Sequence, residues 1–344
     1  MTRNSKSDRR HGRSAERDKT KRRPLVLGVD IGGTKVAAGL VDPRTGEIRS
    51  QVKMPMAACG AAKDGLAAVQ VAIDRLLQDA AIGIRDVQGI GLCAPGPLDP
   101  RRGVVINPPN LPCWRNFPLA KEVSKAYGRS AKLDNDANAA ALAETIWGSG
   151  RGYRNIFFVT IGTGIGTGIV LDGKILHGRT GAAGEGGHVS IDYRGPQCAC
   201  GKRGCIEALA AGPAIARAAR EAARQGPMEA KMLLELAGGD TNAISSEVVG
   251  QAYAKGDAIA QQVLTQTMEY LSCWLGNIID LLEPEVIVVG GGVSLMLKRF
   301  FKGLSKTLPR YCENQRAGET PIVASHFGDA AGIAGAAALC VDPE

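Results

Sequence analysis

Short apolar runs alternate with amphipathic stretches along most of this chain, which is typical of a mixed α/β protein. Apolar runs at Leu25–Asp30 and Lys35–Val41 predict two strands joined by a tight turn, and Glu47–Lys53 predicts a third. An amphipathic helix is predicted over Gly65–Asp79 and a buried strand over Val87–Cys93. We therefore expect three antiparallel strands, a helix, and a fourth strand that ends in a rigid loop of prolines and glycines.

A strand over Asn155–Gly162, a Gly/Thr tip and an apolar return strand repeat the first arrangement, which implies two similar halves. Two further strands are predicted at Glu285–Val289 and Pro321–Ser325. The remaining sequence after residue 205 is mainly helical. The helices predicted there are Gly212–Arg224, Met228–Leu236, Glu247–Lys255, Asp257–Leu282, Leu295–Leu304 and Asp329–Leu339.

Length and charge divide the chain further. A chain of 344 residues that is 44% hydrophobic can bury a sizeable core, and we expect two domains. The formal charge is +8, but residues 1–23 carry ten Lys/Arg against three acidic residues, +7 in all, which leaves +1 for the rest. We predict a disordered basic tail over 1–23, solvated or in contact with acidic surfaces, with no specific nucleic acid partner. No stretch reaches the roughly 18 apolar residues of a membrane span, so we expect a cytoplasmic protein.

One imidazole and three thiols fall on a single glycine-rich segment. His188, Cys198, Cys200 and Cys205 follow one another at intervals of ten, two and five residues. A Cys₃His set of this kind suits a structural Zn²⁺, because protein atoms fill all four tetrahedral positions. Ordinary thiols in a flexible loop, or a disulfide, are the alternatives. A disulfide fits less well, because Cys198 and Cys200 are too close in sequence to pair comfortably and a bridge to Cys205 leaves one thiol over.

Two glycine-rich tips could cradle phosphate, because glycine lets backbone N–H groups approach an anion closely. In the first, Asp30 precedes the glycines and could hold a metal ion through water. The alternative is a plain glycine-rich hairpin, since the motif lacks the ending of a Walker loop. A third turn after Val289 could lie against a nucleobase or ribose. The candidate nucleotide-binding residues are Asp30, Gly32, Gly33, Thr34, Lys35, Gly162, Thr163, Gly164, Gly290, Gly291 and Gly292.

Polar side chains follow two of the predicted strands. Prolines fix an extended backbone that presents Asn107 and Asn110, whose amides could bind the hydroxyls of a polyol or simply form turns. Asp134-Asn135-Asp136 leads from a strand directly into the helix-forming segment Ala137–Trp147. Any of these three could be a helix N-cap, but open α/β sheets also place ligand groups at such junctions. Asp136 is the candidate base.

These motifs together resemble the ROK family, and most closely its bacterial glucokinase-like members. The similarity covers roughly Leu25 to Leu339. It includes DIGGTK and IGTGIGTGIVLDGKILHGRTGAAGE as phosphate motifs, LDNDANAAALAE as catalytic segment, GEGGH with CACGKRGC as zinc motif, and VIVVGGGVS as nucleotide segment. The resemblance implies the actin-like, hexokinase-type (ribonuclease H-like) α/β fold, with two domains around a central cleft. We predict a small domain at 24–135, onto which residues 329–344 pack back, and a large domain at 136–328.

Carried over by motif, the resemblance implies that Asp136 is the catalytic base of a sugar kinase that uses ATP and Mg²⁺. The implied sugar contacts are Asn110, Asn135, Asp136, Glu185, His188 and Glu207. Glucose is the leading substrate, with N-acetylglucosamine or N-acetylmannosamine as the alternative. The family also contains sugar-responsive DNA-binding repressors, but only 23 unpatterned residues precede Pro24. We also expect a homodimer or a dimer of dimers, and nucleotide hairpins that lie outside the zinc segment.

Overall fold

Two five-stranded sheets organise the protein. We describe a computed structural model that places residues 24–341, so the tail predicted over 1–23 lies outside the described residues. The first sheet has the order β3-β2-β1-β4-β7 and the second has the order β10-β9-β8-β11-β12. In each sheet the first three strands form an antiparallel meander, and the other two join it in parallel. The identical order confirms the predicted repetition.

The first sheet lies entirely within residues 25–135. Its strands β1, β2 and β4 are almost fully buried, which explains why they are apolar without alternation. Two helices, α1 (Ala62–Asp79) and α2 (Leu119–Tyr127), pack on one face and enclose a core around Trp114. The strands are β1 (Leu25–Ile31), β2 (Lys35–Val41), β3 (Ile48–Pro55), β4 (Val87–Ala94) and β7 (Ala131–Asn135), and a small ribbon pairs β5 (Leu98–Asp99) with β6 (Val104–Val105).

The second sheet lies within residues 156–324, and most of the helices that follow β10 in the chain pack around one of its faces. The longest helix, α8, buries Trp274. The ring of Trp274 lies edge to face against that of Phe157, with 5.5 Å between the ring centroids. The strands are β8 (Ile156–Ile161), β9 (Ile165–Leu171), β10 (Lys174–Ile175), β11 (Val286–Gly290) and β12 (Ile322–Ala324). The helices are α4 (Ile206–Ala210), α5 (Gly212–Gln225), α6 (Lys231–Leu236), α7 (Ser246–Ala254), α8 (Ala258–Leu282), α9 (Gly292–Leu297) and α10 (Phe301–Thr307).

Most predicted elements are present, with shifted ends. The helix predicted over Leu295–Leu304 is instead two helices joined by a 3-10 turn at Lys298–Phe300. The helix predicted from Met228 begins at Lys231, and helices α2 and α4 were not predicted. Within residues 24–341 no helix is both long and apolar enough to cross a bilayer. The boundary predicted at residue 135 and the oligomeric state stay predictions.

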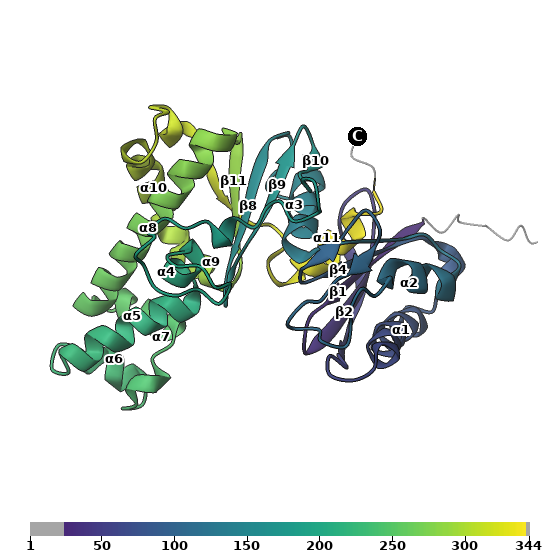
Figure 1. The fold of residues 1–344 in the computed structure, drawn as a ribbon, viewed down its shortest axis with the longest axis horizontal. Coiled ribbons are helices and arrows are strands. Elements are labelled where there is room, and N and C mark those ends of the chain that lie inside the picture. The colour runs from purple at the N-terminus through teal and green to yellow at the C-terminus, as the bar shows by residue number, and fades with distance from the viewer. Residues whose placement is uncertain (1–23, 342–344) are drawn as a thin grey trace, which may run out of the picture.

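Two helices lie between the sheets and connect them (Figure 1). Helix α3 (Asp136–Ile146) continues directly from β7 and packs on β8 and β9 of the other sheet. Helix α11 (Ala331–Ala338), close to the C-terminus, packs on α3, β1 and β4. The buried carboxylate of Glu144 in α3 accepts hydrogen bonds from Ser325 Oγ at 2.6 Å and from the N–H of His326 at 2.8 Å. Glu144 therefore fixes the point where the chain returns from the second sheet to the first.

The contact between α11 and the first sheet depends on the absence of side chains. A Cβ placed on Gly28 of β1 would overlap the carbonyl oxygen of Ile333, and one on Gly91 of β4 would overlap that of Ala336. The helix backbone therefore lies directly on the strands. Close packing of this kind leaves no space for added atoms.

We predict that Gly91→Ala separates α11 from the sheet and lowers the free energy of unfolding by about 3 kcal/mol or more, the upper end for overpacking. Urea denaturation measures this change. The control is Gly303→Ala in α10, where an added Cβ meets nothing within 4 Å. That substitution should be neutral or stabilise the helix by up to about 1 kcal/mol. Equal stability of the two variants would contradict the packing described for α11.

Candidate active site

The first glycine tip closes the hairpin of β1 and β2, as predicted. Ile31 pairs with Val36, and the N–H of Gly32 donates to the carbonyl of Lys35 at 2.9 Å. A Cβ on Gly33 would lie 2.7 Å from the carbonyl oxygen of Asn110, so the predicted sugar contact Asn110 lies beside this tip. Thr34 and Lys35 are exposed beyond the glycines.

Asp30 stands just before the tip, near the end of β1. The thiol of Cys93 on β4 donates to its Oδ1 at 3.6 Å. Burial raises the pKa of Asp30, although the Cys93 hydrogen bond and the charges of Lys35 and Lys53 oppose the shift. Neither lysine forms an ion pair with Asp30, so its carboxylate can accept a further cation.

At the junction between β7 and α3, the structure distinguishes the helix N-cap from the candidate base, which the sequence left open. Asn135 is the N-cap of α3, since its Oδ1 accepts from the N–H of Ala137 at 2.9 Å and of Asn138 at 3.4 Å. Asp136 is the first residue of the helix and accepts from the N–H of Ala137 at 2.8 Å. One oxygen of the Asp136 carboxylate therefore remains for a ligand.

Three carboxylates gather around this junction. Part of the Asp136 side chain is accessible to solvent, while protein atoms surround its carboxyl group on most sides. This desolvation, followed by the charges of Asp30 and Glu185, raises the pKa of Asp136 to about 6. A Cβ on Gly96 would lie 3.8 Å from Asn135 Nδ2 and 3.9 Å from Glu185 Oε1. The structure thus brings Asp30, Asn135, Asp136 and Glu185 together.

The loop that carries Glu185 is held by Thr167, a residue that sequence reasoning missed. The buried hydroxyl of Thr167 on β9 donates to the carbonyl of Gly184 and accepts from the N–H of Gly186 at 2.8 Å. Trp274 Nε1 also donates to the carbonyl of Gly186 at 3.1 Å. The backbone on both sides of Glu185 is therefore fixed. Only the fold reveals this role, because Thr167 lies 18 residues before Glu185.

The second glycine tip closes the hairpin of β8 and β9, where the N–H of Gly162 donates to the carbonyl of Gly164 at 2.9 Å. The Oε2 atom of Glu207 accepts from the N–H of Ile165 at 2.9 Å, and its Oε1 lies 3.9 Å from His188 Nδ1. The second hairpin lies outside the zinc segment, as expected, but it is not independent of that segment, because Glu207 contacts both.

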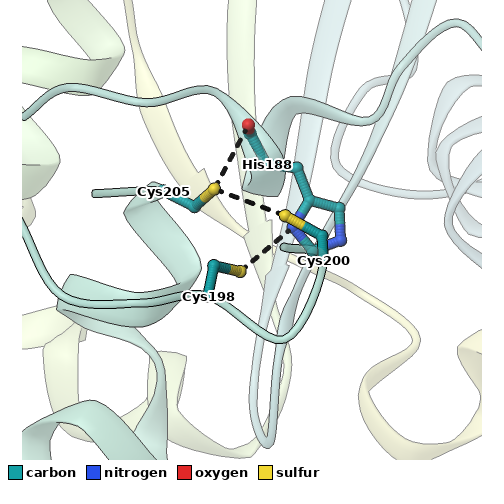
Figure 2. A group of neighbouring side chains, drawn as sticks. All are labelled: His188, Cys198, Cys200 and Cys205. Carbon is teal, nitrogen blue, oxygen red and sulfur yellow. Dashed lines mark hydrogen bonds between the residues drawn. The ribbon is translucent and has the colours of Figure 1, made fainter. Parts of the chain in front are cut away.

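The donor atoms of the four predicted zinc ligands converge (Figure 2). They all lie within 4.8 Å of one another, with Cys198 Sγ 3.6 Å from His188 Nδ1 and Cys200 Sγ 3.6 Å from Cys205 Sγ. In a tetrahedral zinc site with Zn–S near 2.3 Å and Zn–N near 2.0 Å, neighbouring ligand atoms are about 3.5 to 3.8 Å apart. The four residues therefore fit Zn²⁺. The sulfur separation also excludes a disulfide between Cys200 and Cys205 in this structure.

A cavity of about 540 Å³ adjoins the second tip. Gly162, Thr163 and Gly292 line it, together with Arg220 and Glu247, which sequence reasoning missed. Among the three glycines at the end of β11 and the start of α9, only Gly292 lines this cavity. A Cβ on Gly291 would overlap the carbonyl oxygen of Ile161, and one on Gly290 would lie 3.1 Å from Ser325 Cβ. Gly291 is thus required for packing, and a side chain at Gly290 would need Ser325 to shift slightly.

Two sheets of the same strand order, joined by helices and carrying two glycine-tipped hairpins, define the actin-like, hexokinase-type fold. A model of the ROK family matches residues 26–342. The glucokinase of Thermotoga maritima is 33% identical over 317 residues, covering 91% of this chain and 96% of the relative. An N-acetylmannosamine kinase of Escherichia fergusonii is 34% identical over 318 residues, covering 91% of this chain and 97% of the relative.

Among solved structures, a ROK family glucokinase from Streptomyces griseus in complex with glucose and AMPPNP has a TM-score of 0.76 and 34% identity. It covers 92% of this chain and 98% of its own. The chain belongs to the ROK family, and within it to the sugar kinases. The predicted family and fold class are confirmed.

The pKa of Asp136 makes the role of this residue testable. A general base acts in its deprotonated form, so kcat/KM should rise as the pH rises through about 6 and level off above it. Asp136→Asn should lower kcat by at least about 10²-fold while sugar binding survives. The control is Asp172→Asn in the exposed β9–β10 turn, where φ is 50° and Asn is tolerated. Near-normal turnover of Asp136→Asn would exclude Asp136 as the base.

Proposed function

We propose that this protein transfers the γ-phosphate of ATP to the primary hydroxyl of a hexose, with glucose as the leading substrate. The observation that carries the proposal is the position of Asp136 beside Asp30, Asn135 and Glu185, with a pKa of about 6. A carboxyl group with this pKa is largely ionised at neutral pH and can still accept a proton efficiently. The similarity to the glucokinases supports glucose as the acceptor.

The proposed transfer needs no covalent intermediate on the protein. Asp136 accepts the proton of the sugar hydroxyl as that oxygen attacks the γ-phosphate, and Asn110, Asn135 and Glu185 orient the sugar. In phosphoryl transfer the remaining catalysis is positioning and electrostatic stabilisation. The N–H groups of both glycine tips, other than those of Gly32 and Gly162, which bond within their hairpins, would face the phosphates. The 540 Å³ cavity accepts the nucleoside. Closure of the cleft excludes water, which would otherwise compete as acceptor.

Mg²⁺, when bound, would neutralise phosphate charge, with Asp30 facing it through water. The raised pKa of Asp30 fits this place, because no residue of the described range 24–341 forms an ion pair with its carboxylate. Zinc would be held by His188 Nδ1 and the sulfurs of Cys198, Cys200 and Cys205. With four protein ligands it is structural. Nδ1 coordination leaves His188 Nε2 for a sugar hydroxyl.

N-acetylhexosamines remain a second candidate class of acceptor, because the N-acetylmannosamine kinase relative is as similar in sequence identity as the glucokinases. A coupled ADP-release assay over hexoses and N-acetylhexosamines separates the two. We expect the highest kcat/KM for glucose and little ADP release with water alone. A preference for an N-acetylhexosamine would replace glucose as substrate, and ADP release without any sugar dependence would contradict the proposed function.

Removing the metal site should weaken the binding of both the sugar and the nucleotide. Cys200→Ser or Cys205→Ser should reduce zinc from about one per chain to almost none by elemental analysis, because each removes a ligand. The sugar KM should rise, since His188 and Glu207 lose their support. The nucleotide KM should rise as well, through the Glu207 contact with Ile165.

The control is Cys273→Ser, a half-buried thiol on α8 outside the cluster, which should keep its zinc and its kinetic constants. Full activity in a demonstrably zinc-free Cys200→Ser protein would contradict the structural role of the metal. It would also remove the reason for placing Glu207 in the sugar site.

A further inference from the structure

A second cavity lies outside the site described above. It has a volume of about 670 Å³, within the range of small-molecule sites. Residues of both sheets line it, from the β5–β6 turn, α2 and β7 to β10 and the segment that follows it. We call it the basic cavity, after the five cationic residues that line it: Arg101, Arg102, Lys121, Lys132 and Lys174.

The charge of the basic cavity is unbalanced. Asp134 is the one acidic residue among its lining residues, and it is buried with 2% exposure. Its Oδ2 lies 2.6 Å from His177 Nε2, and its Oδ1 accepts from Asn138 Nδ2 at 3.1 Å. The ion pairs of residues 24–341 involve none of the five cations. Like charges gathered in one concave surface repel each other, and a multiply charged anion would relieve that repulsion.

The five cations come from segments that are distant in sequence. Lys121 lies on α2 and Lys132 on β7 of the first sheet, whereas Lys174 begins β10 of the second. Arg101 already connects the two parts, since its Nη2 donates to the carbonyl of Gly178 at 2.9 Å. An anion that contacts Lys121 or Lys132 together with Lys174 would therefore bridge the two sheets.

The basic cavity is close to the active site along the chain. Asp134 lies on β7, two residues before Asp136, which begins α3. Its partner His177 begins the loop that leads to Glu185, and the carbonyl of His177 accepts from the N–H of Ala183 at 3.2 Å. A ligand that shifts His177 or Arg101 would thus shift the loop that carries Glu185.

We propose that the basic cavity is an effector site for a multiply charged phosphate compound, and that its occupation changes the affinity for sugar. Guanidinium and ammonium groups are the side chains that bind phosphate oxygens in proteins. The proposed binding of the anion depends on the cavity alone. The proposed effect on sugar affinity rests on the proposed function. Allosteric coupling requires a second site with differential contacts in two states. A cavity lined by both sheets supplies them, because any change in the relative position of the sheets changes its lining.

Binding is tested by calorimetric titration of inorganic tripolyphosphate into three proteins at constant ionic strength. These are the wild type, the double variant Lys121→Ser/Lys174→Ser, and the control Lys255→Ser/Lys302→Ser, which removes the same charge at exposed positions outside the cavity. We expect equal affinity for wild type and control, and an affinity at least about tenfold lower for the cavity variant. Equal affinity in all three, which would place the anion on the phosphate hairpins alone, would overturn the site.

Two further measurements complete the test. Hexose 6-phosphate and pyrophosphate, compared in the same titration, distinguish a phosphorylated sugar from a phosphate chain as the natural ligand, and binding of neither to the cavity would contradict the proposal. At saturating ATP, tripolyphosphate should change the sugar KM of the wild type and control by at least about twofold, and leave that of the cavity variant unchanged. An unchanged KM in the wild type, despite cavity binding, would overturn the effector role without touching the kinase activity.

Discussion

The packing of α11 on β1 and β4 is the contact on which the rest of the structure depends. Helix backbone and strand backbone touch directly, because glycines stand at the crossing points. The same helix reaches the site, since a Cβ on Gly332 would overlap the Asp30 carboxyl group and Cys93 Sγ lies 3.4 Å from the Gly332 carbonyl oxygen. On its other side α11 packs on α3, which begins at Asp136. One helix therefore sets the spacing between Asp30 and Asp136.

That spacing has an electrostatic consequence. Asp30, Asp136 and Glu185 place like charges near one another, and protein replaces much of the water around Asp30 and Asp136. Asp30 and Asp136 therefore hold their protons more tightly than isolated carboxyl groups, and a cation or a hydroxyl donor relieves the repulsion. This group of carboxylates suits ligands that bring positive charge or hydrogen-bond donors. A sugar and a metal-bound phosphate chain are ligands of this kind.

Glu207 has a comparable role at the second glycine tip. It joins the second glycine tip to the zinc cluster through Ile165 and His188, so neither the hairpin nor the metal segment is held independently. A zinc ion with four protein ligands cannot activate water, but it can keep Glu207 and His188 in register. In this family member the metal would act on catalysis through position alone.

The sequence by itself determined what is local. The strand and turn pattern predicted both hairpins, because alternating apolar runs and glycines specify a turn within a few residues. The four zinc ligands were found because they fall within 18 residues, and the motif order identified the family. Only the tertiary structure decided the rest: that Asn135 and not Asp136 caps α3, that Thr167 holds the Glu185 loop, and that Glu207 contacts the second tip. These contacts, like the basic cavity formed by Lys121 and Lys174, join residues that no local pattern links, and their positions follow from how the two sheets and α11 pack together.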